Sequence, residues 1–122
     1  MDKIQFVISF IDPNLDDEDK ESETQKLLSQ LRNIEEVDRV ERISDTNPPK
    51  RNKAIGGFLP GILLAEITIE NIKTWLAFLN DRLSGKTIEL KVQANGKTLE
   101  VKASSRAELE TAIRLAEEFV MA

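Results

Sequence analysis

The densest group of potential metal ligands is an acidic stretch near the start of the chain. Oxygen-bearing side chains occupy positions 1, 3, 5 and 12 of a loop that would begin at Asp12, the spacing of a helix-loop-helix calcium site. These four residues are Asp12, Asn14, Asp16 and Glu23. The sixth position, where such a loop turns sharply on glycine, is Asp17. We therefore expect no metal, interpret the stretch as the solvated start of a helix, and keep a calcium-responsive domain as an alternative.

One carboxylate stands apart from the others because its sequence neighbours are apolar. Glu66 lies within Leu64-Ala65-Glu66-Ile67, a setting in which an acid can become a general acid or base. The simpler interpretations are an ion pair with Arg82 or Lys53, or an outward orientation at the end of a helix. We expect no catalytic residue, and a small carboxylate-dependent enzyme remains the second hypothesis.

Two further segments have part of a ligand-binding pattern. Lys50, Arg51 and Lys53 form a basic loop, but it contains no aromatic side chain and the chain carries a net charge of −5. Nucleic-acid sites are normally basic, so we interpret it as a solvated loop. The glycines of 56–61 lack the Gly-Lys-Ser/Thr ending that a phosphate-binding loop needs.

The composition removes most of the common catalytic machinery. The 122 residues include no His, Cys or Tyr. A Ser-His-Asp triad, a thiol nucleophile, a disulfide and a zinc site of thiolates or imidazoles are therefore excluded. The longest uncharged run, 54–65, has 12 residues and is too short to cross a bilayer. No signal-peptide pattern follows Met1, so we expect a cytoplasmic protein without membrane contact. We also expect no cofactor.

The elements that would position these residues follow from hydrophobic periodicity. Residues 4–11 predict a strand with apolar groups on both faces, and 17–33 predict a helix with a thin apolar stripe. Residues 37–44 indicate a short edge strand or a bulged one. An apolar stripe over 69–83 predicts a helix that Thr68 caps and Gly85 ends.

The C-terminal third has the clearest pattern. Asn95-Gly96 is typical of a type I′ turn, and folding the chain there gives a hairpin with one apolar face and one face of opposite charges. The predicted cross-strand pairs are Ile88 with Ala103, Glu89 with Lys102, Leu90 with Val101, Lys91 with Glu100, and Val92 with Leu99. Ser105 and Glu108 form a capping box at the start of the last helix.

The segment 54–65 is apolar, glycine-rich and uncharged, and it has no clear period. Pro60 could open a short helix there, or the backbone could be irregular and packed under other elements. The resulting order is β-α-β-(α)α-β-β-α. We therefore predict a single α+β domain over 1–122, with two layers: a four-stranded, mixed or partly antiparallel sheet and helices on its apolar face.

The same segment could instead form a surface for another protein, because its apolar cluster is large for a small domain to cover. Trp75 on the long helix fits an interface as well as a core, and the core is the commoner place for it. The candidate interaction residues are Gly56, Gly57, Phe58, Leu59, Ile62, Leu63 and Trp75. A homodimer could form through this surface, the long helix or an open sheet edge.

One stretch combines Gly56-Gly57 and its apolar run, a helix with Trp75-Leu76, and the strand 88–92 followed by Asn95-Gly96-Lys97. Together with the order of elements over most of 4–120, it resembles the effector-associated constant component family of bacterial conflict systems. This chain departs from that pattern where Pro60 and Gly61 interrupt the apolar run. The resemblance implies a small non-enzymatic adaptor that contacts an effector protease or a signalling NTPase. It implies no catalytic residue.

Overall fold

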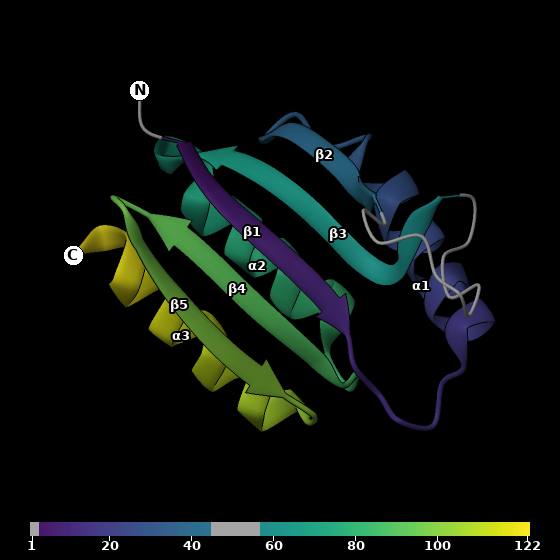
Figure 1. Ribbon diagram of the computed structural model, residues 1–122. Helices are drawn as coiled ribbons and strands as arrows, with labels where there is room; N and C mark the ends of the chain where they lie inside the picture. The colour runs from purple at the N-terminus through teal and green to yellow at the C-terminus, as the bar shows by residue number, and fades with distance from the viewer. Residues whose placement is uncertain (1–2, 45–56) are drawn as a thin grey trace.

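The computed structural model, which describes residues 3–44 and 57–122, contains one five-stranded antiparallel sheet with helices on one face (Figure 1). The strand order is β2-β3-β1-β4-β5. The elements are β1 (Lys3–Phe10), α1 (Asp17–Leu31), β2 (Val37–Ser44), β3 (Phe58–Thr68), the 3-10 turn η1 (Ile69–Asn71), α2 (Ile72–Leu83), β4 (Ile88–Ala94), β5 (Lys97–Ala103) and α3 (Arg106–Met121). The α+β class agrees with the prediction. The predicted four-stranded, mixed or partly antiparallel sheet is wrong, because the described part of the chain has a fifth strand and all of its strand pairings are antiparallel.

The additional strand is β3. It includes residues of the segment 54–65, for which the sequence analysis predicts a short helix or irregular backbone. It pairs with β1 on one side and with β2 on the other. Alternate residues from Leu63 to Ile67 are buried beneath the helices, but Ile62 and Leu64 on the opposite face are also apolar. Apolar side chains on both faces conceal the two-residue period of a strand.

Pro60 and Gly61 are compatible with β3 for specific reasons. Pro60 falls between the paired stretches of β3, so the ladder requires no N–H from it. Gly61 has φ +83° and is buried. A Cβ at this position would lie 3.2 Å from the Lys20 Cβ and 3.3 Å from the Phe10 carbonyl oxygen. Glycine therefore lets β3 bend closely over the start of α1.

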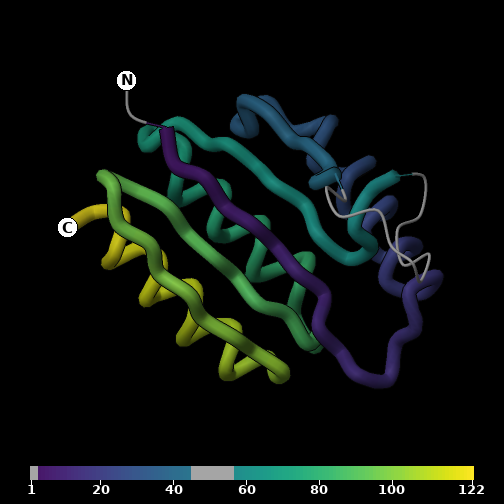
Figure 2. The backbone as a smooth tube through the Cα atoms, viewed as in Figure 1, coloured from purple at the N-terminus to yellow at the C-terminus, as the bar shows by residue number. Residues whose placement is uncertain are grey.

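The core fills the layer between the sheet and the helices. β1 runs through the middle of the sheet, between β3 and β4 (Figure 2). Its inward residues Phe6 and Ile8 are fully buried. Trp75 of α2 meets the Phe6 ring edge-on at 5.5 Å between centroids and stacks on Phe78 at 6.2 Å. Trp75 is therefore a core residue, as the commoner interpretation held.

Two local predictions about the ends of elements are confirmed and one is wrong. Asn95 and Gly96 have φ +54° and +76°, as a type I′ turn requires, and the β4–β5 pairs are those predicted. The Ser105 hydroxyl accepts a hydrogen bond from the Glu108 N–H at 3.1 Å and so caps α3 as predicted. The second bond of the predicted capping box is displaced by one residue, because the Glu108 carboxylate accepts from the Ser104 N–H at 2.8 Å. Thr68 does not cap its helix, because its hydroxyl donates instead to the Asp38 carboxylate on β2.

Candidate interaction surface

The predicted interaction residues lie in different places in the fold. Leu63 and Trp75 are fully buried, so their assignment to a surface is wrong. Gly56 lies outside the described residues. The remaining candidates reach the surface at least in part: Gly57, Phe58, Leu59 and Ile62.

Phe58 and Leu59 take part in an anchor that ties the β2 edge to α1. The Arg42 guanidinium lies 5.2 Å from the centre of the Phe58 ring and donates to the Leu59 carbonyl oxygen at 3.3 Å. Arg42 also makes two hydrogen bonds to the Glu21 carboxylate, one of 2.7 Å. The Arg42 and Glu21 side chains are only 7% and 15% exposed. The bonds from Arg42 lower the pKa of Glu21 against the opposing effect of burial. These side chains therefore serve the fold.

Ile62 belongs to a different surface, the sheet face opposite the described helices (Figure 1). On this face Leu64 lies opposite Val7 of β1, and Ile62 lies opposite Ser9. Ile62, Leu64 and Val7 are half-buried, and none of the three belongs to the core cluster. They form a small aliphatic patch on the two central strands, which we call the open-face patch.

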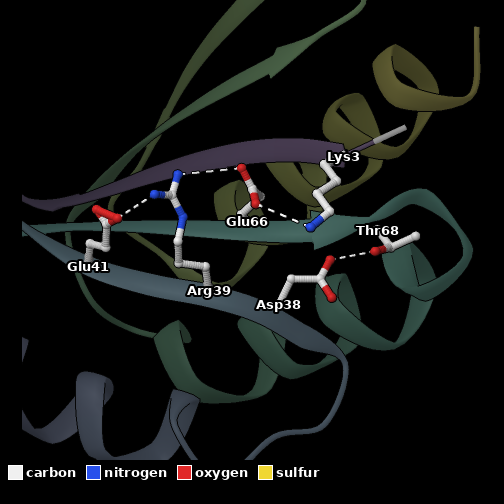
Figure 3. Close-up of polar contacts among 6 residues, drawn as sticks. All are labelled: Lys3, Asp38, Arg39, Glu41, Glu66 and Thr68. Atoms are coloured by element: carbon white, nitrogen blue, oxygen red, sulfur yellow. Dashed lines mark hydrogen bonds and ion pairs between the residues drawn. The ribbon is translucent and has the colours of Figure 1, made fainter. Parts of the chain in front are cut away.

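One end of the open face carries a polar cluster, drawn in Figure 3. Glu66 pairs with Lys3 of β1 at 3.6 Å and with Arg39 of β2 at 3.5 Å, and Arg39 also pairs with Glu41. Of the two expected partners of Glu66, Arg82 is wrong, because it pairs with Asp81 at 2.9 Å. The other, Lys53, lies outside the described residues. The cations that hold Glu66 come from neighbouring strands, which periodicity in one segment cannot reveal.

A shallow hollow of about 400 Å³ lies beside Glu66. It is lined by Lys3, Gln5, Glu66, Gln93 and residues 94–98 of the hairpin turn. Glu66 is the one carboxylate among these lining residues. Proton transfer between two acids would need a second carboxylate, whereas amides and ammonium groups can hydrogen-bond to polar atoms of a partner. The hollow therefore resembles the polar rim of a binding surface.

The acidic stretch 12–23 does not gather its oxygen atoms into a calcium site. Asp12 accepts from the Asn14 N–H at 2.9 Å, and Asp16 accepts from the Asp19 N–H at 2.8 Å as the N-cap of α1. Glu23 forms an ion pair with Lys86 at 2.8 Å. Within 3–44 and 57–122 no three acidic groups converge as metal ligands would. The contacts of Asp12 and Asp16 agree with the prediction that this stretch is the solvated start of a helix.

Comparisons with known proteins give no match: neither a protein-family model, nor a curated protein, nor a solved structure is similar to the chain. No helix in the described ranges is long and apolar enough to cross a membrane. Function is therefore inferred from the chain's own residues, above all from those on the open face of the sheet.

Proposed function

We propose that this protein is a non-catalytic interaction module that binds another protein through the open face of its sheet. The observation that carries the proposal is the open-face patch of Val7, Ile62 and Leu64, three adjacent aliphatic side chains on the face opposite the described helices. When a partner covers half-buried aliphatic groups at the centre of a polar surface, apolar area is removed from water, and this favours binding.

The surroundings of the open-face patch support binding better than chemistry. Charged residues of both signs flank it, with the Glu66 cluster at one end and the β4–β5 charge ladder at one side. The ladder places Glu89 opposite Lys102, and Lys91 opposite Glu100. A mixed polar rim around an apolar centre is the usual anatomy of a protein interface and gives it specificity.

The class of partner follows from the sequence resemblance and stands as a proposal with it. We propose an effector protease or a signalling NTPase of a bacterial conflict system, bound in the cytoplasm. Neither nucleic acid nor a membrane is proposed, because the net charge of −5 opposes binding to phosphate-rich surfaces.

The strand β3 supplies a matched test, because its alternate residues face opposite sides of the sheet. Ile62→Asp and Leu64→Lys place a charge on the open face, whereas Leu63→Asp places one in the core. We expect the two open-face variants to keep a cooperative melting transition close to that of the original chain. We expect Leu63→Asp to be unfolded.

Binding is then measured against purified candidate effectors encoded next to this protein. We expect titration calorimetry to detect binding by the original chain and a loss of at least tenfold in affinity for Ile62→Asp and Leu64→Lys. Equal affinities for folded open-face variants would overturn the assignment of the surface. Neighbouring genes that encode only metabolic enzymes would count against the proposed class of partner.

A further inference from the structure

Within the described part of the chain, β5 (Lys97–Ala103) forms one edge of the sheet, and its outer side pairs with no other described strand. We infer that this edge pairs with the β5 edge of a second copy, so that one antiparallel sheet continues across a two-fold axis at Val101. The inference does not depend on the proposed binding by the open face. Its support comes from backbone geometry, charge complementarity and an apolar groove.

The backbone of β5 is regular along its whole length. All seven pairs with β4 are in register, and the tight turn closes the hairpin between Ala94 and Lys97. In an antiparallel hairpin, hydrogen-bonded and non-hydrogen-bonded pairs alternate from that closing pair. The alternation directs the N–H and C=O groups of Thr98, Glu100 and Lys102 away from β4. A second strand can therefore pair along this edge.

Charge selects one register of self-pairing. With the two-fold axis at Val101, Glu100 lies opposite Lys102 of the second copy, and the same pair forms again across the axis. An axis at Glu100 would instead oppose two glutamates, and an axis at Lys102 would oppose two lysines. Opposite charges facing across strands are stabilising and like charges are destabilising. In the described structure neither Glu100 nor Lys102 makes an ion pair within 4.0 Å.

The helix side of the edge offers an apolar surface at the same place. An open groove of about 340 Å³ lies between β5 and α3. It is lined by Val101, Lys102, Ala107, Glu108, Thr111, Ala112 and Leu115. Leu115 is 40% exposed although it is a large aliphatic residue. The axis at Val101 brings two Val101 side chains together beside this groove, and the second copy then covers Leu115.

Oligomeric state in solution tests the inference. Sedimentation velocity over a range of concentrations should show a dimer for the original chain. Glu100→Lys places like charges opposite each other twice and should weaken the dimer by about tenfold or more. The charge swap Glu100→Lys with Lys102→Glu restores both opposite pairs between copies and should restore the dimer. Lys91→Glu is the matched control, because it places a like charge opposite Glu100 within the hairpin but does not lie on the edge. This variant should stay dimeric.

Each other outcome overturns the inference. A monomer at all concentrations excludes self-pairing, and a dimer unaffected by Glu100→Lys lies elsewhere. Failure of the charge swap to restore a dimer that Glu100→Lys abolished would contradict the register. Leu64→Lys separates this inference from the proposed function, because it should abolish partner binding and leave the dimer intact. If Leu64→Lys dissociates the dimer and Glu100→Lys does not, the open face is the dimer interface.

Discussion

The two edges of the sheet are built in opposite ways. The β2 edge has two register shifts, between Val37 and Arg39 and between Arg42 and Ser44. Two of its charged side chains turn back onto the protein: Arg42 to Glu21, and Asp38 to Thr68. The β5 edge has no shift, and the side chains of Glu100 and Lys102 are exposed. Bulges, and charged side chains that are bonded to other groups of the same protein, keep an edge from pairing with another chain. In the described structure the β5 edge has neither, so it is the edge that can accept a second strand.

The β2 and β5 edges also differ in what their charged side chains do. On the β2 edge a nearly buried ion pair fixes the position of a strand, whereas on β5 exposed charges determine which strand can approach. Buried charges are costly to leave unpaired, and exposed ones contribute little until a partner excludes water from them. The predictions below test this difference from the largest expected effect to the smallest.

Arg42→Met should cause the largest loss of stability. It leaves the Glu21 carboxylate, which is 15% exposed, without its cation and removes the contact over Phe58. We expect the free energy of unfolding to fall by about 3 kcal/mol, measured by chemical denaturation. The double variant Arg42→Met with Glu21→Leu should recover most of the loss, since no unpaired charge then remains. A loss below about 1 kcal/mol in Arg42→Met would show that the anchor is no stronger than a surface pair.

Acid should weaken the same anchor. The hydrogen bonds from the Arg42 guanidinium hold the pKa of Glu21 below its ordinary value of 4.5. The folded protein therefore holds the Glu21 proton less tightly than the unfolded chain does. The stability that the pair contributes is complete above the unfolded-state pKa and is lost as pH falls from there through the lower folded-state pKa. Melting temperatures measured from pH 7 to pH 3 should fall less steeply for Glu21→Gln than for the original chain. Parallel curves would contradict the assignment.

Gly96→Ala should have a smaller effect, confined to the β5 side. The residue has φ +76°, and nothing lies within 4 Å of where a Cβ would be, so the cost is one of backbone conformation alone. We expect a loss of about 1 kcal/mol in unfolding free energy. Gly96→Asn should lose less, because asparagine tolerates this conformation better than alanine. Amide exchange along β5 should be faster in Gly96→Ala and unchanged along β2.

Arg39→Met should have the smallest effect and serves as the control for Arg42→Met on the same strand. The Arg39 side chain is 48% exposed and its partner Glu41 is 45% exposed. Its other partner, Glu66, is 17% exposed but keeps an ion pair with Lys3 when Arg39 is replaced. We expect a loss below about 1 kcal/mol that disappears in high salt. A loss as large as that of Arg42→Met would erase the distinction between nearly buried and exposed charges.

The sequence predicts those parts of the fold whose determinants are adjacent in the chain. The Asn95-Gly96 turn fixes the hairpin register, and Ser105 caps α3 through a residue three positions later. β3 was missed because a central strand with apolar groups on both faces has no period of two, and because Pro60 and Gly61 normally interrupt a strand. The unpaired position of Pro60 depends on β1 and β2, which no local pattern shows.

The candidate surface shows the same limit. Ile62 and Leu63 are both candidate surface residues in the sequence analysis. In the structure Ile62 lies on the open face and Leu63 in the core, and the pairing of the strands determines which of the two turns outward. Val7 and Leu64 become neighbours by pairing across 57 positions of sequence. The Glu66 cluster likewise draws its cations from two other strands. The residues of a surface that spans several strands can be identified only when the order and pairing of those strands are known.

The packing of Trp75 gives the molecule a built-in optical reporter. The chain has one tryptophan and no tyrosine, so near-ultraviolet excitation addresses essentially this single indole. Its ring is fully buried against Phe6, and its N–H has no hydrogen-bond partner in the described structure. Fluorescence should therefore be blue-shifted in the native state and move to the red when the helices leave the sheet. Contacts made on the open face or at β5 should leave the emission unchanged.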